Sequence, residues 1–196
     1  MKFNQRFALC SAAFAGMLLP AAAQTSNPPA NPPATINQRK ENQQDRIANG
    51  VASGELTAGE TANLEKKESA INQEVRTDRS LNGGHLTGQE KQIVNGQQNK
   101  MSNQIYQDKH NAATQHNGNS EVGQRASNQQ SRIANGIASG KLNAAQTSRL
   151  EKGEAGINKE VHADRQANGG HLTQGQKQQV NKQQNGMSAR IYHAKH

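Results

Sequence analysis

The sequence contains few of the residues that reactive or stacking chemistry needs. Its 196 residues include one cysteine, no tryptophan and 3% aromatic side chains. Cys10 lies inside an N-terminal apolar run, so the chain beyond that run has no thiol and forms no disulfide. In the basic second half only Tyr192 supplies an aromatic ring, which does not support a stacking platform for nucleic acid. We therefore expect no specific nucleic-acid partner.

The sequence also lacks the motifs that mark common active sites. It has no G-x-S-x-G, no HExxH pair and no phosphate-binding loop. Asp78 and Asp164 occupy equivalent positions shortly before paired glycines, where an Asp-Arg step is typical of a solvated helix end rather than of a catalytic acid. We predict a protein that is not an enzyme and that carries no cofactor.

The N-terminal residues 1–35 are typical of an export signal followed by a spacer. Lys2 and Arg6 precede the apolar run 7–19, and the small residues 21–23 offer a cleavage site. The run is too short to cross a bilayer, so we expect cleavage after Ala23 and a periplasmic or secreted mature chain without a transmembrane anchor. Residues 24–35 are rich in proline, which favours an extended, disordered tether.

The rest of the chain is a tandem duplication. Residues 36–110 lie over residues 122–196 at an offset of 86 without a gap, and about 45 of 75 positions are identical. These ranges are the first copy and the second copy. Residues 111–121 are rich in Asn, Ala, Ser and Gly and are expected to form a flexible linker. The sequence thus predicts two helical repeat domains.

A six-residue segment, 82–87, recurs unchanged at 168–173 and predicts a turn between two helices. Paired glycines allow the positive φ that ends a helix, and the threonine that follows can cap the next helix. A Glu or Gln three residues after the cap completes a capping box. The expected turn and cap residues are Gly83, Gly84, Leu86, Thr87, Glu90, Gly169, Gly170, Leu172, Thr173 and Gln176. The pairs Thr57–Glu60 and Asn143–Gln146 predict two further helix starts in the same way.

We therefore predict an all-α fold with three helices per copy. In the first copy they span about 38–53, 58–81 and 88–109, and in the second they follow at the same offset. Gly50 is unfavourable in a helix interior, so an alternative end of the first helix at Asn49 stays open. The expected core of one copy is a seam of Ile47, Val51, Leu56, Leu64, Ile71, Val75, Leu81, Leu86, Val94, Met101, Ile105 and Tyr106.

This seam is thin, because domains of this size bury little apolar surface. The second copy is poorer still, since Ala167 replaces Leu81 and Gln179 replaces Ile93. Two arrangements remain open: the copies bury surface against each other or in an oligomer, or they stand independently on the linker. We expect them to unfold separately or in one weak transition.

Charge separates the two copies. The first has ten basic and ten acidic residues, and the second has eleven basic and four acidic residues. The second copy is therefore a candidate surface for an anionic envelope component or for a protein client. The alternative is a solvated helical surface that has no partner.

Histidines provide the candidate metal ligands. His193 and His196 are three apart on an expected helix, where two imidazoles can share a metal. The equivalent His85 and His171 would meet if the copies packed suitably about a pseudo-twofold axis. No carboxylate or thiol stands at a fixed spacing from either pair, so specific metal binding is an alternative rather than the leading hypothesis.

The glycine turn resembles an EF-hand loop, because Gly84, Leu86 and Glu90 stand where that family has its bend glycine, its hydrophobe and its bidentate glutamate. The resemblance covers only the helix-loop-helix shape, since the first half of the loop supplies no side-chain oxygen at the ligand positions. We expect no calcium binding.

Two further resemblances concern the whole repeat. The segment 172–176, Leu-Thr-Gln-Gly-Gln, resembles the Leu-Thr-x-x-Gln motif of the Spy and CpxP type of periplasmic stress chaperones, which are small exported helical proteins. Taken together, the segments Arg-Ile-Ala-Asn-Gly, Asn-Gly-Gly-His-Leu-Thr and Ile-Tyr-x-x-Lys-His resemble uncharacterised exported bacterial helical-repeat proteins, which implies no activity. The leading hypothesis is a non-enzymatic binding or structural module of the cell envelope. The alternative is a periplasmic stress chaperone or a loose metal-binding protein.

Overall fold

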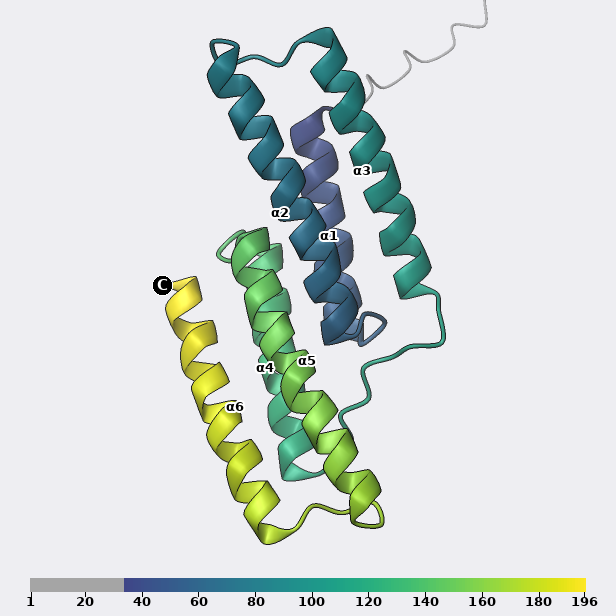
Figure 1. The fold of residues 1–196 in the computed structure, drawn as a ribbon, viewed down its shortest axis with the longest axis vertical. Coiled ribbons are helices and arrows are strands. Elements are labelled where there is room, and N and C mark those ends of the chain that lie inside the picture. The colour runs from purple at the N-terminus through teal and green to yellow at the C-terminus, as the bar shows by residue number, and fades with distance from the viewer. Residues whose placement is uncertain (1–33) are drawn as a thin grey trace, which may run out of the picture. The chain divides into compact units, whose positions relative to one another are not determined.

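The computed structural model describes residues 34–196, so the expected export signal and most of the tether lie outside the described residues. Within this range the chain forms six α-helices and no strand (Figure 1): α1 (Ile36–Ser53), α2 (Ala58–Leu81), α3 (Gly88–Lys109), α4 (Glu121–Ala138), α5 (Ala144–Ala167) and α6 (Gln174–Lys195). The prediction of an all-α fold is confirmed for these residues. None of the six helices combines the length and the apolar character that crossing a membrane requires.

Capping residues explain where the helices begin. All four predicted capping boxes form: in each, the N-cap side chain accepts a hydrogen bond from the N3 amide, and the N3 side chain accepts one from the N-cap amide. A fifth capping box joins Thr35 and Gln38, so α1 begins at Ile36, two residues before the predicted start. The sequence carries this signal as a Thr with a Gln three residues later. Ser120 caps α4.

The α1 helix continues through Gly50 to Ser53, so the alternative end at Asn49 is wrong. A Cβ atom at Gly50 would lie 2.7 Å from Cδ1 of Leu56, which is fully buried. The second copy repeats this arrangement with Gly136 and Leu142. The glycine is needed because the leucine of the following turn packs onto the helix backbone. This packing offsets the helix-propensity cost of about 1 kcal/mol.

The recurring glycine turns form as predicted. The φ angles of Gly83 and Gly84 are 62° and 93°, and those of their counterparts in the second copy are 63° and 92°. The amide of Gly84 donates to the carbonyl oxygen of Arg79 at 2.7 Å, which ends α2. Leu86 is buried beyond the turn, and Thr87 starts α3.

Within each copy, the third helix packs against the first two: α3 against α1 and α2, and α6 against α4 and α5. Buried glutamines link these helices. Gln43 donates to the carbonyl oxygen of Gln98 at 2.7 Å and to Oγ of Ser102 at 2.9 Å, and Gln98 donates to the carbonyl oxygen of Ile36. The same bonds recur in the second copy between Gln129, Gln184, Ser188 and Val122.

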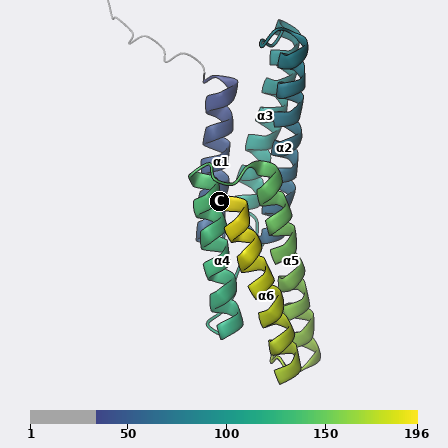
Figure 2. The same ribbon diagram turned by 90° about the vertical axis from the view of Figure 1, so that its left-hand side faces the viewer.

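The two copies pack against each other through equivalent helices. α2 packs against α5, and the two helices run in opposite directions (Figure 1). α1 contacts α4, on the other side of the unit (Figure 2). Oγ of Ser148 donates to the carbonyl oxygen of Ala62 at 2.8 Å, and these two positions are equivalent in the repeat. A pseudo-twofold axis therefore passes close to this bond.

One continuous apolar core runs through both copies, and residues Ala34–His196 form one compact unit. Of the two arrangements that the sequence left open, the structure shows the one in which the copies bury surface against each other. Ten of the twelve predicted core residues of the first copy are buried. Leu81 and Tyr106 are not: 77% and 59% of their surfaces are exposed. Leu81 is the last residue of α2, and Tyr106 stacks on His110 at the surface.

The exposure of Leu81 corrects a second expectation. Its replacement by Ala167, and that of the half-exposed Ile93 by Gln179, do not make the second core poorer, because neither side chain belongs to the first core.

Candidate functional site: two equivalent grooves between the copies

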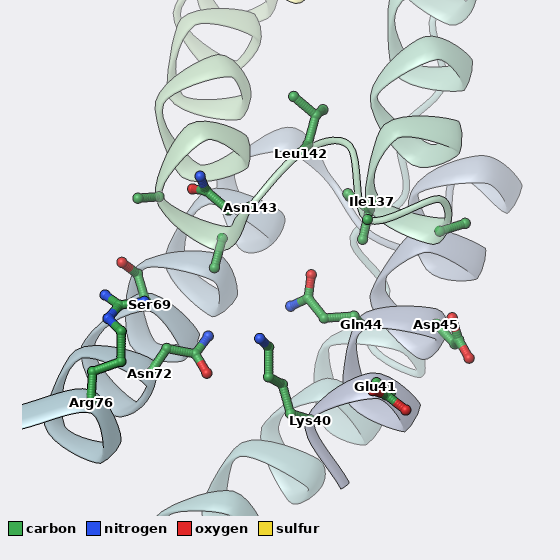
Figure 3. Close-up of a pocket in the computed structure, with 14 residues that line it drawn as sticks. Lys40, Glu41, Gln44, Asp45, Ser69, Asn72, Arg76, Ile137, Leu142 and Asn143 are labelled. Carbon is green, nitrogen blue, oxygen red and sulfur yellow. The ribbon is translucent and has the colours of Figure 1, made fainter. Parts of the chain in front are cut away.

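A cavity of about 450 Å³ lies where the first copy meets the turn between α4 and α5 (Figure 3). We call it the open groove. Its wall in the first copy includes Lys40, Asn72 and Arg76, and its wall in the second copy includes Gly140, Asn143 and Ala144. Figure 3 shows the side chains of Lys40 and Asn72 extending into the space between α1 and α2. The groove is therefore lined by polar groups of both charge types and by exposed backbone at a helix start.

The pseudo-twofold axis relates the open groove to a second groove, between α4, α5 and the turn after α1. Ala126, Asn158 and His162 stand there at the positions of Lys40, Asn72 and Arg76. This second groove is occupied by residues 114–117 of the linker, and we call it the linker groove. The two grooves thus differ in what occupies them, although their walls are built from equivalent positions of the repeat.

Gln115 anchors the linker in its groove. Its backbone amide donates to the carbonyl oxygen of Gly54 at 2.8 Å, and its side-chain oxygen accepts from the amide of Ala58 at 3.1 Å. Asn117 accepts from the Gln115 side chain at 2.7 Å and donates to Ser127. Gln115 and Asn117 are also partly buried, whereas their immediate neighbours are exposed. The expectation of a flexible linker therefore does not hold for this segment.

Small residues make room for the linker. A Cβ atom at Gly123 would collide with the carbonyl oxygens of Asn117 and Gly118. The position equivalent to Gly123 in the first copy is Asn37, and the position equivalent to Ala126 is Lys40, which lines the open groove. The walls of the two grooves have therefore diverged: the linker groove accepts a closely packed backbone, and the open groove carries longer and charged side chains.

Four glutamates lie fully buried on the helices that join the copies. Glu65 and Glu68 of α2 and their counterparts Glu151 and Glu154 of α5 have 0% exposed surface. Gln44 donates to Glu65 at 3.1 Å, and the equivalent Gln130 donates to Glu151 at 2.9 Å. Neither carboxylate oxygen of Glu154 has a hydrogen-bond partner among the described residues. Buried carboxylates with so few partners favour the protonated form.

The pKa values reflect this burial. Loss of solvation raises the pKa of Glu151 to about 8 and the pKa values of Glu65 and Glu154 to about 7. Loss of solvation also raises the pKa of Glu68, and the positive charge of Lys40 and a hydrogen bond from Asn72 partly offset this rise. The like charge of Glu154, and after it that of Glu65 across the interface, raises the pKa of Glu151 further. Glu65, Glu151 and Glu154 are therefore largely protonated in the folded protein at pH values well below 7.

The structure does not gather the candidate metal ligands. His85 and His171 are exposed and lie in the α2–α3 and α5–α6 turns, at opposite ends of the unit (Figure 1). The copies pack through the first halves of the antiparallel helices α2 and α5. The turns that follow these helices therefore lie far apart, and the two histidines do not meet. His193 and His196 are exposed near the end of α6, and Tyr192 stacks on His196. No group of three or more His, Cys, Asp or Glu side chains in residues 34–196 is placed to hold a metal ion.

The resemblance to an EF-hand loop rests on Glu90, and the structure gives this carboxylate another role. It accepts from the Thr87 amide at 2.8 Å and from the Asn82 side chain at 2.9 and 3.0 Å. These bonds lower the pKa of Glu90, with the Thr87 amide as the largest cause. In the second copy, Gln176 makes the same bonds to Thr173 and Asn168 without a charge. The carboxylate acts as a cap, a role that an amide can also fill.

The sequence analysis did not identify the buried glutamates or the grooves. A signal for the glutamates exists, because Glu68 lies four residues after Leu64 and three before Ile71, on the apolar stripe of α2, and Glu154 lies on the same stripe of α5. No comparable signal marks the grooves, because each is built from both copies. Comparison with known protein families, curated proteins and solved structures finds no match for this chain.

Proposed function

We propose that the protein is a non-catalytic binding module of the cell envelope, built by duplication of a three-helix unit, and that the open groove is its binding surface. The observation that carries this proposal is the difference between the grooves: one holds a segment of polypeptide, and its equivalent is a cavity of about 450 Å³. Export to the periplasm or beyond rests on the N-terminal sequence, and the non-catalytic role on the absence of catalytic motifs.

Site-specific photo-crosslinking tests this function. A photoreactive residue at Ala145, which lines the open groove, is expected to form a discrete adduct in intact cells. The matched control is the same residue at Gly59, the equivalent position in the first copy, next to the Ala58 amide to which the linker already bonds. Absence of an adduct at Ala145, or the same adducts at both positions, would remove the groove as a binding surface. The chemistry of the adduct also tells an anionic envelope polymer from a protein client.

The chaperone alternative requires an exposed apolar surface. The large apolar side chains exposed in residues 34–196 are Leu81, Ile93, Tyr106 and Tyr192, which are spread over α2, α3 and α6. A binding groove of polar character accounts better for what residues 34–196 present. Aggregation assays with a model client separate the two functions, because a holdase delays aggregation at several-fold excess and a selective groove does not.

A further inference from the structure

The linker groove shows which chemistry the repeat uses to hold a polypeptide. Gln115 offers two complementary groups to one turn: its amide N–H meets the carbonyl oxygen of Gly54, and its side-chain oxygen meets the amide of Ala58. Ala58 is the first residue of α2, so its N–H is one of those that a helix leaves without an intrahelical partner. Gln115 therefore recognises a backbone acceptor and a helix-start donor together.

The open groove presents the same two backbone groups in the second copy. They are the carbonyl oxygen of Gly140 and the amide of Ala144, the first residue of α5. The turn between them has the same geometry: φ is 67° at Gly140 and 75° at Gly54, and Leu142 bonds to Gly136 at 2.9 Å as Leu56 bonds to Gly50 at 3.0 Å. Gly140 lies in the turn before α5, and within residues 34–196 neither its carbonyl oxygen nor the Ala144 amide takes part in a hydrogen bond to a turn, loop or side chain.

The chain's own N-terminal segment does not supply the matching residue. The position 86 residues before Gln115 is Pro29, which has neither an N–H group nor a side-chain amide. A proline at this position cannot make the two bonds that Gln115 makes in the linker groove.

We propose that the open groove binds an extended segment of another polypeptide through a glutamine, whose amide N–H donates to Gly140 and whose side-chain oxygen accepts from Ala144. This proposal rests on the proposed function, because it names the ligand of the same groove. The duplication has freed one of two equivalent peptide sites, and the other is filled from within. The wall of the open groove adds selectivity: Lys40 stands where Ala126 lies against the linker, so an acidic residue near the glutamine gains a partner that the linker lacks.

The probe for this proposal is a synthetic peptide with the linker sequence 111–116, titrated into the mature protein while amide chemical shifts are recorded. It leaves out Asn117 and Gly118, because Asn37 stands where Gly123 accepts their backbone. We expect weak, saturable binding with a Kd on the order of 0.1–1 mM, since a short flexible peptide must be ordered on binding. The largest shifts should fall on Gly140 and Ala144. Shifts confined to Gly54 and Ala58, or no shifts at millimolar peptide, would overturn the proposal.

Two peptide controls need no change in the protein. The peptide with Gln115→Ala is expected to bind at least tenfold more weakly, because it loses the bond to the Ala144 amide. The natural peptide 25–30, which has Pro29 in the place of Gln115, is expected to show no saturable binding. Equal binding of all three peptides would show that glutamine is not recognised.

One protein variant removes a single donor. Ala144→Pro deletes the N–H at the first position of α5, where proline is well tolerated and the fixed φ suits the helix. Peptide binding should fall at least tenfold while helix content stays the same. If the crosslink at Ala145 forms but the peptide does not bind, the groove remains a binding site and the glutamine proposal fails. If the peptide binds and no crosslink forms in cells, the recognition chemistry stands and the cellular function fails.

Discussion

The two copies have buried carboxylates at the same two positions but different charges around them. In the first copy Lys40 faces Glu65 and Glu68 and favours their ionised forms. In the second copy the equivalent residue is Ala126, and no cation within residues 34–196 contributes to the pKa values of Glu151 and Glu154. Lys40 extends into the open groove, and the small side chain of Ala126 leaves room for the linker in the other groove. The second copy therefore holds its carboxylates in the more apolar surroundings, which makes it the more pH-sensitive half.

The largest expected effect is on stability as a function of pH. The pKa values of Glu65 and Glu154 rise from 4.5 to about 7, and that of Glu151 to about 8, so the folded state binds more protons than the unfolded state within this window. Stability is then full below about pH 4.5 to 5 and is lost as the pH rises through about 8. We expect the Tm to fall by about 10 °C between pH 5.5 and pH 8.5, which corresponds to a few kcal/mol. Calorimetry in matched buffers measures this.

The control for that experiment is the double variant Glu151→Gln with Glu154→Gln, whose Tm should vary much less over the same range. A Tm that is constant or that rises with pH in the unmodified protein would contradict the burial of these carboxylates. Because one core runs through both copies, we also expect a single cooperative transition, which replaces the expectation of separate unfolding.

The next effect compares the stability cost of equivalent buried glutamates in the two copies. In the part of the chain that the structure describes, Glu154 has no hydrogen-bond partner for either oxygen, whereas Glu68 accepts from Asn72 and faces Lys40. At pH 8, Glu154→Gln should stabilise the protein by about 1–2 kcal/mol, because a neutral amide avoids burying a charge. Glu68→Gln should give a smaller gain or a loss. Urea unfolding of both variants at pH 8 and pH 5 measures the difference, and equal changes for the two would show that Lys40 is not the source of the asymmetry.

A third effect concerns the linker. Gly123→Asn gives the second copy the residue that the first copy has at position 37, and the new side chain collides with the backbone of Asn117 and Gly118. We expect the linker to leave its groove at a cost of about 1–3 kcal/mol. Hydrogen exchange at the Gln115 amide should then accelerate. The matched variant Asn37→Gly should leave that amide protected, and unchanged exchange in Gly123→Asn would show that the linker is not held by this contact.

The smallest effect is expected at the two positions where the sequence predicts a poorer apolar core for the second copy. Leu81→Ala and Ile93→Gln place the residues of the second copy into the first, at side chains that are 77% and 48% exposed. Each should change the free energy of unfolding by less than about 0.5 kcal/mol. Leu64→Ala, at a fully buried position, is the control and should cost about 2–5 kcal/mol. A loss above 1 kcal/mol for either exposed residue would mean that it is covered in solution.

Local signals in the sequence determined much of this structure. The capping boxes at Thr57, Thr87, Asn143 and Thr173 set four helix starts, and paired glycines set the turns before α3 and α6. Each of these features depends on atoms within about six residues along the chain, so the information is complete in the local sequence. The apolar stripe likewise identified the seam, because its spacing follows the helix period.

The tertiary structure decided what the local patterns could not. Helix propensity makes Gly50 a weak point of α1, but the side chain of Leu56 packs against it in the structure. The apolar pattern places Leu81 in the core, but the end of α2 is exposed to solvent. The burial of Glu65 and Glu151 depends on the other copy, and so does the difference between a filled groove and an open one. Helix starts arise from neighbours in sequence, but burial, pKa values and cavities arise from segments that are distant in the chain and come together only when the two copies pack.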